Sequence, residues 1–301
     1  MSASHPRVLL FGKNGQLGIE LHRLLAPSSQ IVALDIEECD LEKPDAVRRM
    51  VRDVRPSIII NASAYTDVER AEQEPEKAQA INAVAPAVMA EEAVVLGTGL
   101  IHYSTDYVFD GTKGSPYTED DANHPLNAYG RSKLEGEKAI RATGVHHLIL
   151  RTSWLYGTRG KNFLLTILRL ADERSELRIV CDQSGAPTWS RSLAEGTVKI
   201  LERLNWQLPT PGRTYHATAG GHTSWYGFAA KALSLSSDLK LKSTRTVPIP
   251  SSDYPTNARR PVNSRLSNER LHHELGVSLP NWEEDLQRVM AILNAEGLGK
   301  I

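Results

Sequence analysis

Five short apolar runs, without regular polar alternation, are the feature that most constrains the fold of this 301-residue sequence. A strand of this composition is buried on both faces, as in a parallel sheet that helices cover on both sides. The runs lie at residues 8–11, 31–34, 58–60, 100–103 and 148–150.

Longer amphipathic segments separate these runs, at residues 17–25, 45–54, 75–96 and 129–142. An alternation of strands and helices is typical of a doubly wound, parallel α/β sheet of the Rossmann type. We therefore expect residues 1–155 to form a dinucleotide-binding domain.

After about residue 154 the alternation loosens. Helical patterns continue at residues 162–173, 192–204, 225–235 and 282–295, between connections rich in proline and glycine. These patterns predict that residues 156–301 form mainly a smaller, mostly helical substrate-binding lobe. Later segments of this region can also form part of the sheet domain.

The charge balance argues against nucleic acid and membranes as partners. The sequence has 35 basic and 36 acidic residues, so it carries no excess of cations for a phosphate backbone or an anionic lipid surface. The first residues lack a signal-peptide pattern, and we expect no apolar stretch near the roughly 20 residues that span a bilayer. Cys39 and Cys181 cannot form a disulfide framework. We expect a cytoplasmic protein.

Three glycines directly after the first apolar run indicate a phosphate-binding loop. Gly12, Gly15 and Gly18 open the first predicted helix, where backbone N–H groups and the helix dipole favour a pyrophosphate. Asp35 follows the second run, and a carboxylate there accepts hydrogen bonds from ribose hydroxyls, which favours NAD. Lys13 in the loop favours a 2′-phosphate instead. We expect both NADH and NADPH to serve.

A tyrosine and a lysine four residues apart, Tyr129 and Lys133, lie on one face of the predicted helix before the fifth run. Thr105 follows the fourth run, at the carboxyl edge where such sheets bind ligands. Reduction of a ketone needs an acid for the developing alkoxide, and we expect the lysine charge to lower the tyrosine pKa toward the working range. Lys133 is also placed to hold the nicotinamide ribose, and Thr105 to bond the ketone oxygen and the phenol.

These motifs resemble the extended short-chain dehydrogenase/reductase family, most closely its members that reduce 4-keto deoxysugars linked to a nucleotide. The most specific segments read Ser-Thr-Asp-Tyr-Val-Phe and Asp-Gln-Ser-Gly-Ala-Pro-Thr. The resemblance extends over nearly the whole chain, through residues 10–18, 61–68, 102–110, 125–130, 151–156, 182–188 and 258–266. It implies hydride transfer from NADH or NADPH to the C4 ketone of dTDP-4-dehydro-L-rhamnose.

The resemblance also implies roles for individual residues. Tyr129 matches the proton donor, with Lys133 and Thr105 as its partners. Thr105, Asp106 and Trp154 match residues that hold the sugar, and either Arg259 or Arg260 matches a position that can pair with the diphosphate. The implied cofactor-binding residues are Gly12, Gly15, Gln16, Leu17, Gly18, Asp35, Asp40, Leu41, Ala64, Tyr65, Thr66, Tyr129 and Lys133.

One departure from the family concerns metal and assembly. Some members dimerise around a magnesium ion that glutamates hold, and Glu20 matches the first of those positions. Arg191 and Ile292 stand at the other two, and neither side chain supplies an oxygen ligand. We therefore expect no metal, and a monomer or a weak homodimer.

Two other functions fit the same motifs. An epimerase or dehydratase of the family would recycle a tightly held NAD, but a dehydratase usually needs a second acid where Tyr107 follows Asp106. A non-catalytic regulatory subunit on the same fold is the other alternative. The intact set of Thr105, Tyr129 and Lys133 argues against the loss of catalysis.

Overall fold

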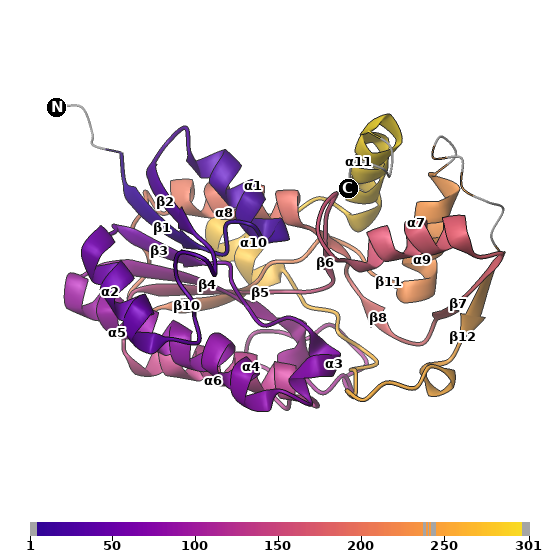
Figure 1. Ribbon diagram of the computed structural model, residues 1–301, viewed down its shortest axis with the longest axis horizontal. Coiled ribbons are helices and arrows are strands. Elements are labelled where there is room, and N and C mark those ends of the chain that lie inside the picture. Colours follow the sequence, from indigo (N-terminus) through magenta and orange to yellow (C-terminus); the bar gives the residue numbers. More distant parts are fainter. Residues whose placement is uncertain (1–4, 237–238, 240, 242–244, 297–301) are drawn as a thin grey trace.

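A six-stranded parallel sheet forms the centre of the protein, in a computed structural model that describes residues 5–236, 239, 241 and 245–296 (Figure 1). The strand order is β10-β5-β4-β3-β1-β2. The strands are β1 (Arg7–Phe11), β2 (Gln30–Leu34), β3 (Ile58–Asn61), β4 (Gly99–Thr105), β5 (His147–Thr152) and β10 (Arg213–His216). The five predicted strands and the α/β fold class are confirmed.

The sixth strand, β10, was not predicted. Among the described strands it pairs with β5 alone, at the edge of the sheet, and it reads Arg-Thr-Tyr-His rather than as an apolar run. An edge strand carries fewer buried side chains, so the apolar signal is weak. The later chain thus returns to the sheet here, while the residue at which a second lobe begins stays a prediction.

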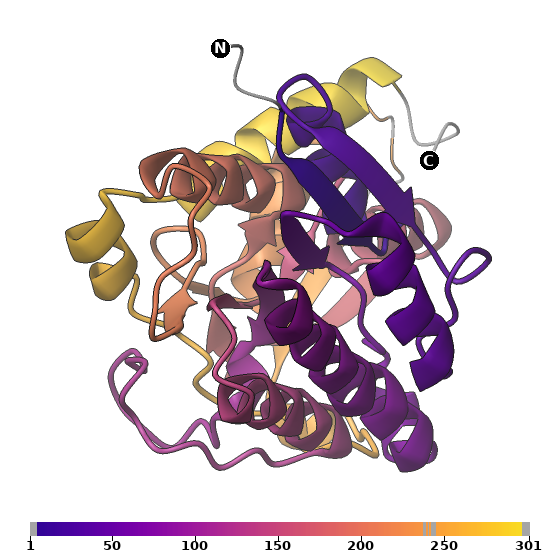
Figure 2. The same cartoon turned by 90° about the vertical axis from the view of Figure 1, so that its left-hand side faces the viewer.

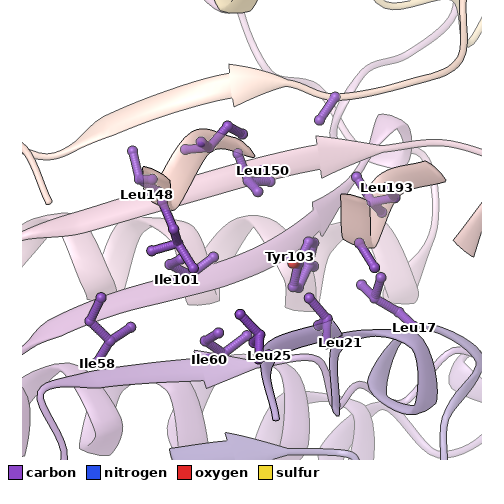
Figure 3. Close-up of a cluster of buried hydrophobic side chains, with 14 of the residues drawn as sticks. Leu17, Leu21, Leu25, Ile58, Ile60, Ile101, Tyr103, Leu148, Leu150 and Leu193 are labelled. Atoms are coloured by element: carbon purple, nitrogen blue, oxygen red, sulfur yellow. The ribbon is translucent and has the colours of Figure 1, made fainter. Parts of the chain in front are cut away.

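Helices cover both faces of the sheet, as Figures 1 and 2 show. One face packs on α1 (Gln16–Leu25), α8 (Ser190–Arg203) and α10 (Glu269–Leu275). The other packs on α2 (Pro44–Val54), α5 (Ala85–Leu96) and α6 (Ala128–Ala142). Alternate strand residues serve opposite faces, so Leu10 joins the first cluster and its neighbour Leu9 the second. Figure 3 shows the first cluster between the sheet and α1.

The helix predicted at residues 75–96 is interrupted. It consists of α4 (Pro75–Gln79), a π-helical turn η1 (Ala80–Val84) and α5. Among the described residues, Pro75–Leu96 is the one helix long and apolar enough to cross a membrane, which the sequence analysis did not expect. Half of its most apolar window is buried, and Val88 and Met89 pack against the sheet. Core helices of globular proteins have this composition.

The π-helical turn brings the backbone of Asn82 against α6. The buried side-chain amide of Asn82 donates hydrogen bonds to the Tyr65 carbonyl (3.0 Å) and to Ser132 Oγ (3.0 Å). A Cβ atom on Gly136 would lie 2.1 Å from the Asn82 carbonyl oxygen, so only glycine permits this approach. The turn therefore sets how closely α6 lies to the neighbouring helix.

The chain after residue 155 forms further helices around Phe228, Trp282 and Leu286. They are α7 (Phe163–Glu173), α9 (Trp225–Ser234) and α11 (Trp282–Glu296). The prediction of a mostly helical region was incomplete, because three two-stranded sheets also occur there. They pair β6 (Leu155–Tyr156) with β9 (Thr188–Trp189), β8 (Ser184–Gly185) with β11 (Thr223–Ser224), and β7 (Glu176–Val180) with β12 (Arg245–Ile249). Strands β6, β8, β9 and β11 have two residues each and are too short to show a period. Strand β7 alternates exposed and buried residues, a signal that the sequence offered and that was missed.

Gly136→Ala tests the contact between α6 and the π-helical turn. Helix propensity alone would make alanine more stable by about 0.5–1 kcal/mol, but the new Cβ overlaps the Asn82 carbonyl. We expect a net loss of about 1–3 kcal/mol, as for other overpacked sites, in urea unfolding. Gly114→Ala is the control, because nothing lies within 4 Å of its added Cβ. A Gly136→Ala protein as stable as wild type would contradict the role given to this contact.

Candidate active site

The carboxyl ends of β1 to β5 open onto one cavity of about 790 Å³. This volume lies in the range of small-molecule sites. Most of the predicted cofactor-binding residues line it: Gly12, Gly15, Gln16, Leu17, Asp35, Asp40, Leu41, Ala64, Thr66, Tyr129 and Lys133. The predicted substrate-binding residues Thr105, Asp106 and Trp154 line it too. Gly18 and Tyr65 lie outside its lining.

The glycine loop passes from β1 into α1. Gly12 adopts a left-handed backbone with φ of 87°, which favours glycine. Gly18 lies beneath the loop, where an added Cβ would come within 1.8 Å of the Gly12 carbonyl oxygen. Gly15 precedes α1 and gives it no side-chain cap, so the first N–H groups of the helix have no side-chain acceptor at this position. This arrangement suits an anionic pyrophosphate.

Asp35 lines the cavity as predicted, whereas Lys13 lies outside it. The Asp35 carboxylate lines the cavity and accepts hydrogen bonds from the backbone N–H groups of Asn14 (2.9 Å) and Ile36 (2.9 Å). Lys13 pairs with Glu38 and does not line the cavity. The hydrogen bond from Lys13 holds the pKa of Glu38 below its usual value. The lysine charge is thus already compensated locally.

Tyr65 supports the loop that carries Ala64 and Thr66. Its backbone N–H donates to Asn82 Oδ1 (2.8 Å), while its hydroxyl donates to Glu74 (2.6 Å). Its two neighbours line the cavity and its side chain does not. The structure therefore places Tyr65 behind the predicted nicotinamide-binding segment.

Thr105 and Asp106 form a hydrogen-bonded pair at the end of β4. Thr105 Oγ1 donates to Asp106 Oδ1 (2.9 Å) and accepts from the Tyr107 N–H (3.2 Å). Asp106 is 3% exposed. Burial raises the pKa of Asp106 to about 7. The single hydroxyl hydrogen of Thr105 is donated to Asp106. When Asp106 is protonated, its own hydroxyl can donate to Thr105 Oγ1 instead. The Thr105 hydrogen is then free to bond another acceptor.

The predicted lowering of the Tyr129 pKa by Lys133 stays a prediction. Burial raises the pKa of the Tyr129 phenol, and a hydrogen bond with Thr105 opposes that shift. Lys133 Nζ donates to the Tyr103 carbonyl (2.6 Å) and lies 3.1 Å from His102 Nε2. Burial lowers the pKa of Lys133 to about 8, while Glu137 opposes that shift. A phenol with a raised pKa keeps the proton that a ketone reduction requires.

Two residues that the sequence analysis did not single out belong to this site. Trp225 stacks on Trp154, with ring centroids 3.5 Å apart and planes 6° apart, and lines the cavity with it. No local motif marks this contact between distant segments. His102 contacts Lys133, and a signal existed for it: a histidine within an apolar run must find a hydrogen-bond partner.

The structure also separates the two candidate arginines. Arg260 lines the cavity and forms an ion pair with Glu69 of α3 (Val68–Ala71) at 2.9 Å. Arg259 is exposed and does not line the cavity. Of the two, Arg260 is therefore the one placed to meet a ligand.

The positions that the family resemblance matched to magnesium ligands carry an ion pair and an apolar side chain here. Glu20 pairs with Arg23 (2.9 Å) and Arg191 (3.2 Å), and Ile292 packs against an apolar cluster. Within the described ranges, no group of three His, Cys, Asp or Glu side chains is arranged to hold a metal ion. The expectation of a metal-free protein stays a prediction.

The glycine loop and the Tyr129–Lys133 pair meet in one cavity at the carboxyl edge of a parallel sheet. This combination defines an NAD(P)H-dependent oxidoreductase.

Comparison with known proteins identifies the family. The model of the RmlD substrate binding domain matches residues 6–295, so the chain belongs to that family. It is 48% identical to a dTDP-4-dehydrorhamnose reductase of Burkholderia thailandensis over 283 residues, covering 92% of this chain and 95% of that protein. The Escherichia coli (strain K12) dTDP-4-dehydrorhamnose reductase is 44% identical over 289 residues, covering 94% and 96%. The solved structure of a dTDP-4-dehydrorhamnose reductase from Bacillus anthracis in complex with NADP has a TM-score of 0.88 at 34% identity, covering 95% and 99%.

Proposed function

We propose that this protein reduces the C4 ketone of dTDP-4-dehydro-L-rhamnose to give dTDP-L-rhamnose, with NADH or NADPH as the hydride donor. The observation that carries the proposal is that Thr105, Tyr129 and Lys133 line the same cavity as the glycine loop. The dTDP-4-dehydrorhamnose reductases that cover nearly the whole chain support the choice of substrate.

The residues at the amino-terminal part of the cavity fit a dinucleotide. Gly12 and Gly18 keep side chains out of the loop, and the start of α1 offers N–H groups to a pyrophosphate. Asp35 is placed to accept from ribose hydroxyls, and Lys133 to donate to the nicotinamide ribose. When bound, the reduced dinucleotide supplies the hydride.

Tyr129 is the proton donor in this proposal. As the ketone carbon accepts hydride, negative charge develops on its oxygen, and the Tyr129 hydroxyl transfers its proton to that oxygen. Thr105 donates a hydrogen bond to the same oxygen once Asp106 no longer accepts its hydrogen. Much of the rate comes from placing the ketone within attack distance of the donor.

The remainder of the cavity is assigned to the sugar nucleotide. Asp106 and Trp154 hold the sugar, and Trp225 completes the aromatic wall next to it. Arg260 is placed to pair with the diphosphate. Most of the second half of the chain, residues 156–301, acts as the substrate-binding lobe.

Both cofactors serve in this proposal. Asp35 disfavours a 2′-phosphate through its charge, but it already accepts two backbone hydrogen bonds. Lys13, whose charge Glu38 compensates, gives NADPH little advantage. Neither group therefore dominates the preference.

The protein acts in the cytoplasm as a monomer or weak homodimer, without a structural metal. The ion pairs of Glu20 with Arg23 and Arg191 occupy the acidic position that a metal would need. We expect light scattering after size-exclusion chromatography to give the same mass with and without EDTA, and activity to be unchanged. A dimer that dissociates on chelation would contradict this part of the proposal.

Tyr129→Phe tests the proposed proton donor. Loss of the hydroxyl is expected to lower kcat by at least about 10²-fold, the low end for removing a positioned general acid, with little change in the Kd for NADPH. Turnover is followed as NADPH oxidation, and cofactor affinity by fluorescence titration. Tyr226→Phe, outside the cavity, is the matched control and should retain wild-type kcat. Comparable turnover in both variants would remove Tyr129 from the mechanism.

A further inference from the structure

A row of buried polar side chains lies behind Lys133. Lys133 Nζ of α6 is 3.1 Å from His102 Nε2 of β4, and His102 Nδ1 is 3.1 Å from Asn61 Nδ2 of β3. Asn61 Oδ1 accepts from the Ser63 N–H (3.1 Å). Lys133, at the cavity, is 1% exposed, and His102 and Asn61 behind it are 0% exposed.

The hydrogen bonds of Asn61 determine which nitrogen of His102 carries hydrogen. The Ser63 N–H requires the amide oxygen of Asn61, which leaves the Asn61 NH₂ group facing His102 Nδ1. Nδ1 is then an acceptor, so the neutral ring carries its hydrogen on Nε2. An imidazolium is not an alternative, because burial and the nearby Lys133 charge lower the pKa of His102 well below its usual value.

The hydrogen on Nε2 points toward Lys133. A neutral amine accepts that hydrogen bond, whereas an ammonium has three donors and no acceptor. Lys133 already donates to the Tyr103 carbonyl, which suits either charge state. If the Asn61 amide were flipped, its NH₂ group would face the Ser63 N–H, and two donors would then meet there instead. The arrangement therefore disfavours the charged form of Lys133.

We propose that His102 and Asn61 are positioning residues that set the pH at which Lys133 loses its charge, and thereby the alkaline limit of the reaction. This inference rests on the proposed function, in which Lys133 donates to the nicotinamide ribose, because an ammonium is a stronger donor than a neutral amine. Below this limit the Lys133 ammonium donates a charge-assisted hydrogen bond to the nicotinamide ribose. As the pH rises through the limit, that hydrogen bond weakens and activity falls.

The other charged groups around Lys133 do not cancel the influence of His102 and Asn61 on its charge state. On its own helix, Glu137 favours the ammonium, but Arg151 of β5 (2.7 Å) and Arg141 (2.9 Å) both pair with that carboxylate. On the same helix, Tyr129 is neutral because burial raises its pKa. His147 of β5 disfavours charge on His102. Burial lowers the pKa of Lys133 to about 8, which is the same direction as the effect proposed for His102 and Asn61.

Asn61→Asp is the variant that reverses the arrangement. A carboxylate accepts from both Ser63 N–H and His102, so the ring hydrogen moves to Nδ1 and the bare Nε2 accepts from the ammonium. The alkaline limb of kcat/KM is expected to move up by at least about one pH unit, a tenfold change in the protonation equilibrium. Asn61→Leu controls for the added charge: it removes the donor to Nδ1 and should move the limb in the same direction.

The ring tautomer gives a readout that needs no turnover. Long-range ¹H–¹⁵N spectra of ¹⁵N-labelled protein, with the His102 signals assigned by their loss in His102→Gln, should show hydrogen on Nε2 in wild type and on Nδ1 in Asn61→Asp. Hydrogen on Nδ1 in wild type overturns the inference, as does a tautomer that switches while the limb stays in place. An inactive wild type with the expected tautomer would overturn the proposed function and, with it, the stated role of Lys133.

Discussion

The burial of Lys133 between α6 and the end of β4 is the constraint on which the site depends. An ammonium out of water is costly unless it is hydrogen-bonded and compensated. Here the Tyr103 carbonyl accepts from it, but Glu137, one helical turn further along α6, also pairs with Arg141 and Arg151, so the compensation is only partial. The same helix carries Tyr129 one turn earlier, so the position of α6 sets the place of the phenol as well.

The position of α6 in turn depends on the helix before it. The π-helical turn η1 presents the Asn82 carbonyl to Gly136, and the Asn82 side chain fastens the loop that carries Ala64 and Thr66. Asn82 therefore contacts both α6, which carries the proposed proton donor Tyr129, and the segment proposed to lie under the nicotinamide. A change at this contact is expected to affect the fold and the site together.

Much of the sheet could be predicted because its central strands are buried on both faces and read as apolar runs. Thr105, Tyr129 and Lys133 were predicted together because strand order brings their segments to one edge. The edge strand β10 and the π-helical turn left no such pattern, since Arg-Thr-Tyr-His is not apolar and Ala-Ile-Asn-Ala-Val reads as ordinary helix. The stacking of Trp225 on Trp154, the pairing of Lys13 with Glu38 and the contacts of His102 depend on tertiary packing, which spacing alone does not determine.

In the proposed reaction, hydride passes directly from the cofactor to C4 of the sugar, and the cofactor is consumed. The most direct measurement uses NADPH that carries deuterium at both C4 positions of the dihydronicotinamide, with dTDP-4-dehydro-L-rhamnose as substrate. Mass spectrometry and NMR of the product should find one deuterium at C4 of dTDP-L-rhamnose for each NADPH oxidised. A product without deuterium at C4, or turnover that leaves the NADPH concentration unchanged, would contradict direct reduction and favour an epimerase that recycles its cofactor.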